Sequence, residues 1–296
     1  MNNMINATTI LTGLLGHPVR HSISPRMHNE AFRLLGLDYA YLCFDVDETH
    51  LGEAVAGLRA LGARGFNLTM PNKNRVLDYL DETKGAASLV HAVNTVVCEN
   101  GRLTGYITDG IGFFRGLRDT GFEPAGKKIT VLGSGGAACA IIAQAVLEKA
   151  AEIRVFFRPS SRYAPRMEKL AEDAAAMQGE CRLTLHDLAD QDGLGASILE
   201  SDLLVNATSV GMGKGSQDTL IHDLSLFSPR LRVADVIYEP IRTRLLEDAS
   251  RAGCNVMNGL PMLLYQGAEA FRLWTGQNMP VDEIRRTVFG YQDKAF

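Results

Sequence analysis

The amino-acid sequence predicts an α/β protein with two domains and mostly parallel sheets. Segments of strand pattern alternate with segments of helical periodicity from end to end, which is the order that parallel sheets with helical crossovers require. The chain has 296 residues, more than the ~150 residues that one domain commonly holds. A Gly-rich turn between a strand and a helix in the second half is typical of a doubly wound, Rossmann-type domain. We therefore expect such a domain beside another α/β domain.

The first half of the chain is expected to form one α/β unit. Ser24 and Pro25 predict a helix start, because a Ser oxygen caps free amides and Pro is tolerated at the first helical position. Gly36 ends this helix, and Asn100 with Gly101 favours a hairpin turn. Strands are expected at 8–16, 39–46, 65–70 and 92–97, and helices at 24–36, 50–62 and 72–82.

The second half predicts a further unit after a boundary rich in Gly, Pro and Lys at 121–128. A strand, the Gly-rich turn, a helix and a second strand then make one complete βαβ crossover. The last two helices are amphipathic and could pack on either unit. Strands are expected at 128–133, 153–158, 181–188, 202–208 and 232–238, and helices at about 110–119 and at 138–150, 261–276 and 281–290.

Composition excludes several classes of protein. The net charge of -4 leaves no basic stripe for a nucleic-acid partner. Five cysteines without a C-x-x-C pair suggest neither a disulfide framework nor a zinc site, which favours a reducing cytoplasm. The start of the chain has no signal-peptide pattern, and no apolar run of about 18 residues occurs. We expect a cytoplasmic protein that is neither secreted nor membrane-spanning.

The Gly-rich turn runs from Gly133 through Ser134, Gly135 and Gly136 to Ala137 and Ala138. Glycines at such a turn let the backbone point its amides at a pyrophosphate on the helix N-terminus. Ala138 takes the last position of the G-x-G-x-x-G/A pattern and still permits close packing of the helix on the strand. A glycine run alone would more often be a plain turn, but the flanking βαβ pattern favours dinucleotide binding.

The end of the next strand bears on which nicotinamide cofactor binds. An acidic residue there would bind the ribose hydroxyls of NAD, but the chain has Phe157, Arg158, Pro159, Ser160 and, two residues on, Arg162. Two guanidinium groups with hydroxyls between them suit a 2′-phosphate. NADP is therefore favoured over NAD, although exposed arginines after a strand can also be merely solvated.

Lys73 and Asp109 are the candidate reacting residues. Lys73 follows a strand and Pro71, and Asp109 stands at a helix start. Oxidation of an alcohol by hydride transfer requires removal of the hydroxyl proton, which a lysine amine can accept while a carboxylate orients it. From spacing alone, a solvated lysine and an N-cap aspartate are the commoner readings.

Ser22 and Ser24 lie two residues apart on an extended segment, so both hydroxyls could bind one substrate carboxylate. The alternative is that Ser24 only caps the helix and Ser22 is a loop serine. His17, Arg20, His21 and His28 surround them, but no acidic or Cys partner stands at ligand spacing, so no metal is expected.

Seven segments resemble, in order, motifs of the shikimate dehydrogenase family over nearly the whole chain: HSISPRMHN, GFNLTMPNK, AVNTVV, TDGIGF, GSGGAA, NATSVGM and YQGAEAFRLWTG. The MPNK and LYQGAEAFRLWTG segments are similar in particular to the quinate/shikimate dehydrogenase branch. The resemblance implies a substrate-binding domain at 1–110, an NAD(P)-binding Rossmann domain at 111–255 and C-terminal helices at 256–296 that return to the substrate domain.

The resemblance also implies residue roles, with Lys73 and Asp109 as the catalytic pair and Ser22 and Ser24 on the substrate carboxylate. Tyr238 would border both ligands. The residues implied for the ring hydroxyls are Thr69, Asn94 and Gln266. Those implied for the cofactor are Gly133, Ser134, Gly135, Gly136, Ala137, Phe157, Arg158, Pro159, Ser160, Arg162, Ser209, Val236, Ile237, Tyr238, Glu239 and Gly259.

Three positions depart from the family pattern. Ile107 stands where Asn commonly precedes Thr-Asp, Phe157 replaces the Asn of the usual Asn-Arg pair, and Glu239 occupies a site where Asn is frequent. These changes bear on specificity more than on reaction type.

The resulting hypothesis is reversible hydride transfer between NAD(P) and a ring hydroxyl of shikimate or quinate. One alternative is a dehydrogenase of the same scaffold for another polyol acid, such as an aminated shikimate analogue. Another is a cofactor-binding regulator without catalysis, against which the presence of both Lys73 and Asp109 argues. The oligomeric state is left open, with a homodimer as one candidate.

Overall fold

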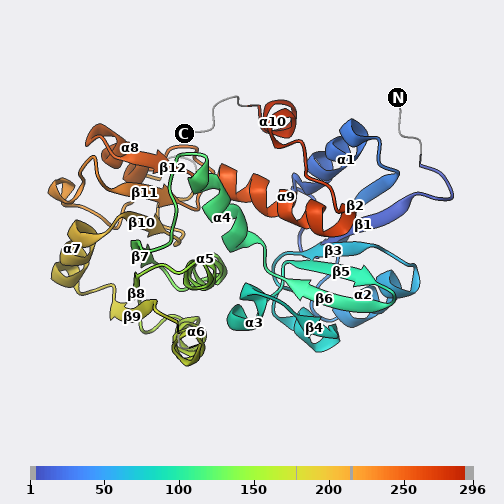
Figure 1. Ribbon diagram of the computed structural model, residues 1–296, viewed down its shortest axis with the longest axis horizontal. Helices are drawn as coiled ribbons and strands as arrows, with labels where there is room; N and C mark the ends of the chain where they lie inside the picture. The colour runs from blue at the N-terminus through green and yellow to red at the C-terminus, as the bar shows by residue number, and fades with distance from the viewer. Residues whose placement is uncertain (1–4, 178, 214–215, 291–296) are drawn as a thin grey trace. The chain divides into compact units, whose positions relative to one another are not determined.

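Figure 1 shows the computed structural model of the protein, which describes residues 5–177, 179–213 and 216–290. The chain forms two compact units. The first unit contains the described residues up to Thr108 and those from Leu264 onward, and the second unit runs from Asp109 to Leu263. The sequence places the domain boundaries after residues 110 and 255, and these boundaries stay a prediction.

The first unit is built on a six-stranded sheet with the order β2-β1-β3-β5-β6-β4. β1 pairs parallel with β2 and β3, and β4 pairs parallel with β6, whereas β5 is antiparallel to β3 and β6. Asn100 and Gly101, with φ of 51° and 75°, turn the chain between β5 and β6, as the expected hairpin requires. The strands are β1 (Ile10–Gly16), β2 (Tyr39–Asp45), β3 (Gly65–Leu68), β4 (Glu82–Thr83), β5 (Thr95–Glu99) and β6 (Arg102–Tyr106).

The helices α1 and α9 pack together over this sheet through a shared apolar cluster (Figure 1). Met27 and Phe32 of α1 meet Phe271 and Trp274 of α9 in it. Trp274 lies so close to β3 that a Cβ on Gly65 would come 2.2 Å from its Nε1. The helices of the unit are α1 (Ser24–Leu35), α2 (Leu51–Ala60), α3 (Ala86–Val90), α9 (Leu260–Thr275), α10 (Val281–Ile284), the 3₁₀ turn η1 (Arg75–Tyr79) and the π turn η3 (Arg285–Phe289).

The start of α1 differs from its prediction in one respect. The helix begins at Ser24 and ends before Gly36, which has φ of 65°, so both expected limits are confirmed. The cap position is Ile23, however, and no side chain accepts a hydrogen bond there. The prediction that Ser24 caps the helix is therefore wrong.

The helix expected at 72–82 is also absent as such, because only η1 forms and Glu82 already belongs to β4. The backbone explains the difference. The carbonyl of Lys73 accepts a hydrogen bond from the amide of Val93, so it does not serve a helical turn. The Asn74 side chain is bonded to His91 O at 2.9 Å. Contacts with a distant segment thus override the local helical pattern.

The second unit has a six-stranded, fully parallel sheet with the order β12-β11-β10-β7-β8-β9. Counted from its first strand this is the 3-2-1-4-5-6 order of a doubly wound dinucleotide-binding fold. The predicted fold class is confirmed. The strands are β7 (Lys128–Leu132), β8 (Glu152–Phe157), β9 (Arg182–Asp187), β10 (Leu203–Asn206), β11 (Arg232–Asp235) and β12 (Asn255–Met257).

Helices cover both faces of this sheet. α7 and α8 contribute Leu194, Ile198 and Leu246 to one apolar cluster beneath Leu132 and Val233. α4 and α6 contact α5, which follows β7 on the other side of the sheet (Figure 1). The helices are α4 (Asp109–Arg118), α5 (Gly136–Leu147), α6 (Ala164–Ala176), α7 (Gln191–Glu200), α8 (Arg244–Arg251) and the 3₁₀ turn η2 (Leu224–Leu226).

Candidate functional site

Polar side chains gather at one edge of the first sheet. Ser22 and Ser24 follow β1, Thr69 and Lys73 follow β3, and Asn94 immediately precedes β5. Because β5 is antiparallel to β3, its beginning lies beside the end of β3. The structure therefore brings these predicted residues to the same edge of the sheet, where ligand sites of α/β proteins commonly form.

Asn94 stands at the centre of a dense hydrogen-bonded group. Its side chain is buried, and its Oδ1 accepts from the amide of Thr108 at 2.9 Å and from the hydroxyl of Thr95 at 2.9 Å. Its Nδ2 donates to Thr108 Oγ1 at 3.0 Å and lies 3.5 Å from Gln266 Oε1. Asn94 and Gln266, both predicted to bind ring hydroxyls, thus lie side by side.

Thr69 and Lys73 are held by the backbone around β3. The Thr69 amide donates to Leu15 O at 3.0 Å, and the Val93 amide donates to Lys73 O at 2.8 Å. A Cβ on Gly16 would come 2.2 Å from Thr69 Cγ2, so the glycine at the end of β1 leaves room for this threonine. Both predicted side chains are half-buried.

Ser22 and Ser24 face β2. The hydroxyl of Ser22 accepts a hydrogen bond from the Ser24 amide at 3.3 Å. Burial raises the pKa of Tyr41 well above its usual value, and a hydrogen bond with Ser24 opposes the rise. Burial likewise raises the pKa of Cys43, with a hydrogen bond to Ser22 opposing it. Both serines are half-buried.

In the second unit the Gly-rich turn has the geometry that a pyrophosphate requires. Gly133 has φ of 115°, and a Cβ there would come 2.8 Å from Ala207 O, so glycine is needed. A Cβ on Gly135 or Gly136 would meet no atom within 4 Å, and Gly135 is the N-cap of α5. The free amides of α5 thus face open space beside the turn, which fits a bound phosphate.

Arg158 and Arg162 follow β8 and are exposed. Arg162 donates to Tyr163 Oη at 2.6 Å and lies over its ring. Within the described part of the chain no ion pair or hydrogen bond engages the Arg158 guanidinium. Arg166 lies near the turn as well, since its charge opposes the rise that burial causes in the pKa of Cys139. This concentration of positive charge fits a 2′-phosphate.

The segment Val236–Glu239 is shaped by two buried side chains. Asp235 accepts from the Ile237 amide at 3.0 Å and from Thr243 Oγ1 at 2.8 Å, and Asn206 donates to it at 3.1 Å. Burial raises the pKa of Asp235, and these hydrogen bonds oppose the rise.

Gly259 packs against this same segment. A Cβ on Gly259 would come 2.1 Å from Val236 O. Tyr238 and Glu239 are exposed at the tip of the segment, and Ser209 is exposed after β10. These residues follow β10, β11 and β12 at the carboxyl edge of the second sheet.

Asp109 is the first residue of α4 and of the second unit, whereas Lys73 belongs to the first unit. Lys73 and Asp109 thus belong to different units, and their role as a catalytic pair stays a prediction. Thr108 is a further residue of this group that the sequence alone did not indicate, although its side chain is buried and bonds both ends of the Asn94 amide. Its place next to Asp109 in the TDGIGF motif was the available signal.

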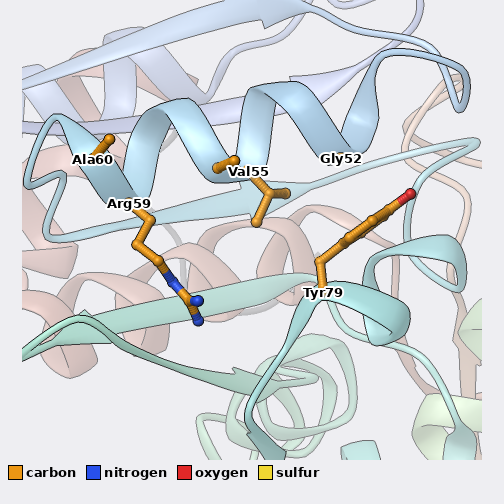
Figure 2. Close-up of a pocket in the computed structure, with 6 residues that line it drawn as sticks. Gly52, Val55, Arg59, Ala60 and Tyr79 are labelled. Carbon is orange, nitrogen blue, oxygen red and sulfur yellow. The ribbon is translucent and has the colours of Figure 1, made fainter.

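Residues of α2 and η1 line a hollow of about 380 Å³, and Figure 2 draws these residues as sticks. Arg59 at its rim is paired with Asp81, and none of the predicted site residues line it. The lining residues are Gly52, Val55, Ala56, Arg59, Ala60 and Tyr79. Its walls are mostly apolar.

Neither a metal-binding cluster nor a membrane-spanning helix is found in the described residues. They contain no group of three or more His, Cys, Asp or Glu side chains that could hold a metal ion. Among them, no helix has the length and apolar character needed to cross a bilayer.

The doubly wound sheet with its Gly-rich turn, joined to an α/β unit that gathers polar groups at one sheet edge, defines the class of two-unit dinucleotide-binding oxidoreductases. Residues 14–96 match the model of the shikimate dehydrogenase substrate binding domain, and residues 259–289 match that of the shikimate 5'-dehydrogenase C-terminal domain. The shikimate dehydrogenase (NADP(+)) of Listeria monocytogenes serotype 4b (strain F2365) is 47% identical over 285 residues, 96% of this chain and 97% of that protein. The chain belongs to the shikimate dehydrogenase family.

Two solved structures are similar over nearly the full chain. Shikimate 5-dehydrogenase from Listeria monocytogenes in complex with shikimate and NAD has a TM-score of 0.94 and 46% identity, covering 98% of this chain and 99% of that one. Quinate dehydrogenase from Corynebacterium glutamicum in complex with NAD has a TM-score of 0.83 and 31% identity, covering 96% and 99%. The predicted family is therefore confirmed, and the chain is an enzyme of that family.

Proposed function

We propose that the protein catalyses the reversible, NADP-dependent oxidation of a ring hydroxyl of shikimate. The observation that carries the proposal is the Asn94 group beside Gln266, at the sheet edge that also bears Thr69 and Lys73. A buried amide, Asn94, beside a half-buried amide and half-buried hydroxyl and amine groups suits a small molecule with several hydroxyls. The relatives named shikimate dehydrogenase (NADP(+)) support the same substrate.

In the proposed reaction Lys73 accepts the proton of the reacting hydroxyl while the ring carbon becomes a carbonyl carbon. Asp109 orients the Lys73 amine, and a carboxylate partner stabilises the ammonium that forms. Ser22 and Ser24 hold the substrate carboxylate, and Thr69, Asn94 and Gln266 fix the ring hydroxyls. Bound NADP supplies the hydride acceptor. In the reverse direction Lys73 returns its proton to the oxygen.

NADP is proposed over NAD from the charge beside the Gly-rich turn. The exposed Arg158 guanidinium has no ion-pair partner in the residues that the structure describes, and Arg162 follows it closely. A 2′-phosphate would complete this site, whereas the adenosine ribose of NAD would leave it uncompensated. The residues proposed along the rest of the cofactor are Gly133 to Ala137, Phe157 to Ser160, Ser209, Val236 to Glu239 and Gly259.

Quinate is a second candidate substrate. The similarity to the quinate dehydrogenase of Corynebacterium glutamicum favours it. Quinate shares a ring, a carboxylate and several hydroxyls with shikimate, so the same polar groups could bind it.

Steady-state rates with shikimate and quinate, each with NADP and NAD, test the proposal. We expect the highest kcat/KM for shikimate with NADP. Absence of turnover in all four combinations, with NADPH still bound, would instead favour a cofactor-binding regulator without catalytic activity. Turnover of another polyol acid alone would reassign the substrate.

We also propose that the enzyme works in the cytoplasm. All five cysteines are free thiols, as a reducing compartment maintains them. Fractionation of cells that produce the protein tests this location.

A further inference from the structure

A chain of buried hydrogen bonds ends at Asn94. Tyr41 Oη donates to Asn67 Oδ1 at 2.8 Å, and Asn67 Nδ2 donates to Thr95 Oγ1 at 3.0 Å. Thr95 Oγ1 in turn donates to Asn94 Oδ1 at 2.9 Å. All four side chains are at most 7% exposed, so water does not compete for these bonds. The chain crosses the sheet from β2 through β3 to β5.

The direction of every bond in the chain is determined by backbone groups. Asn67 Nδ2 also donates to the carbonyl of Asn94 at 3.0 Å, and a carbonyl can only accept. The amide of Asn67 is therefore oriented with its oxygen toward Tyr41. Since Thr95 accepts from Asn67, its single proton is left for Asn94 Oδ1 at 2.9 Å, which is much nearer than the other neighbouring oxygen, Thr108 Oγ1 at 3.4 Å. At the other end, the amide of Thr108 can only donate, and it also points at Asn94 Oδ1.

The Thr95 hydroxyl and the Thr108 backbone amide thus both donate to Asn94 Oδ1, and the opposite end of the side chain must be the NH₂ group. That group meets Thr108 Oγ1 and the side of Gln266. A flipped amide would face its nitrogen toward the proton of Thr95 and the N–H of Thr108, which a buried site tolerates poorly.

We propose that the Thr95 hydroxyl is a positioning residue which, as the last donor of the Tyr41–Asn67–Thr95 chain, holds the Asn94 amide with its NH₂ group on the side of Gln266, where the proposed function places the ring hydroxyls. The inference rests on the proposed function. Asn94 then recognises a ring oxygen as an acceptor, and it selects substrates whose hydroxyl donates its own proton elsewhere. Thr95 itself does not touch the substrate.

Steady-state kinetics of Thr95 variants test the inference. Thr95→Val keeps the shape and removes the hydroxyl, and loss of one such hydrogen bond should raise KM for shikimate about five- to tenfold. An interaction made equally in the bound and transition states changes KM and leaves kcat unchanged. The KM for NADP should also stay unchanged. Thr95→Ser retains the hydroxyl and should restore the shikimate KM, whereas Thr95→Ala, which lacks the hydroxyl, should not.

A double-mutant cycle shows whether Thr95 acts through Asn94. In an Asn94→Ala background, Thr95→Val should have no further effect on the shikimate KM. Thr104→Val is the matched control, because Thr104 is a buried threonine of β6 whose hydroxyl bonds Glu82 instead. It should behave as the wild type.

The failing outcomes are distinct. An inactive wild-type enzyme overturns the proposed function and this inference with it. An active wild type whose Thr95→Val and Thr104→Val variants have equal shikimate KM values overturns the inference alone. So does an effect of Thr95→Val that persists in full in the Asn94→Ala background, or one that raises KM for NADP equally.

Discussion

The imidazole of His28 lies flat against the ring of Tyr41, with centroids 4.5 Å apart and planes 13° apart. His28 is fully buried, and among the described residues neither of its ring nitrogens has a hydrogen-bond partner. Burial lowers its pKa to about 3 from the usual 6.5. A neutral histidine thus packs within the apolar cluster between α1, α9 and the sheet. It lies against Tyr41, the first member of the hydrogen-bonded chain that ends at Asn94.

Stability should therefore fall with acidification. Because the folded-state pKa is depressed, the unfolded chain binds the proton of His28 between pH 6.5 and about 3 while the folded protein does not. The free energy of unfolding then decreases by up to ~1.4 kcal/mol per pH unit as pH falls through this window. His28→Phe keeps an aromatic ring and should lose the part of the pH dependence of the unfolding free energy that His28 contributes. Urea unfolding at pH 7, 6, 5 and 4 measures it, and equal slopes in both proteins would contradict the assignment.

Lys73→Ala should abolish most turnover. General acid–base groups contribute about 10²- to 10⁴-fold to rate, so kcat should fall at least about a hundredfold. NADPH affinity, measured by fluorescence titration, should be unchanged because Lys73 lies outside the second unit. Lys84→Ala is the control, since Lys84 is an exposed lysine bonded to Glu82 at 3.2 Å. Unchanged turnover in Lys73→Ala would remove the proposed mechanism.

Arg158→Ala should weaken NADP selectively. A charge-assisted hydrogen bond contributes about 1.5–3 kcal/mol, so KM for NADP should rise about ten- to a hundredfold, with KM for NAD nearly unchanged. Arg182→Ala is the matched control, because Arg182 is an exposed arginine at the opposite end of the neighbouring strand β9. If KM for both cofactors rises equally, Arg158 does not bind the 2′-phosphate.

Gly133→Ala should destabilise the second unit more than its backbone strain alone explains. Gly126 also has a positive φ, of 71°, but a Cβ there meets nothing within 4 Å. Gly126→Ala therefore measures the strain alone, about 1–2 kcal/mol. Gly133→Ala adds the contact with Ala207 O and should cost clearly more in urea unfolding. Equal losses of unfolding free energy in the two variants would show that the turn accommodates the added Cβ at no further cost.

The sequence predicted what local patterns determine. Alternating apolar segments predicted both sheets, and Gly133 to Ala138 predicted the turn between β7 and α5. Short elements without a strong period, such as β4, α3 and β12, were not anticipated. The absence of the expected 72–82 helix was not anticipated either. It depends on the hydrogen bond from the Val93 amide to Lys73 O, between residues 20 apart in the chain.

The candidate site shows the same division. The family resemblance provided Asn94, Thr69 and Gln266, but no local pattern indicated that Tyr41 and Asn67, 26 residues apart, would be bonded. Non-local contacts of this kind arise only when strand register is set. The Ser24 cap does not form because the helix already includes Ser24, so that the cap position falls on Ile23.

Trp274 donates its indole N–H to Val96 O, 178 residues earlier in the chain, and accepts on its carbonyl from Arg64, 210 residues earlier. On the ribosome, the first sheet would therefore emerge with one face uncovered and wait for the whole second unit before α9 arrives to cover it. The part of the protein that is synthesised first is completed last. During that interval the apolar strands of the first sheet are exposed, so this is the stage of biosynthesis at which chaperones would be most needed.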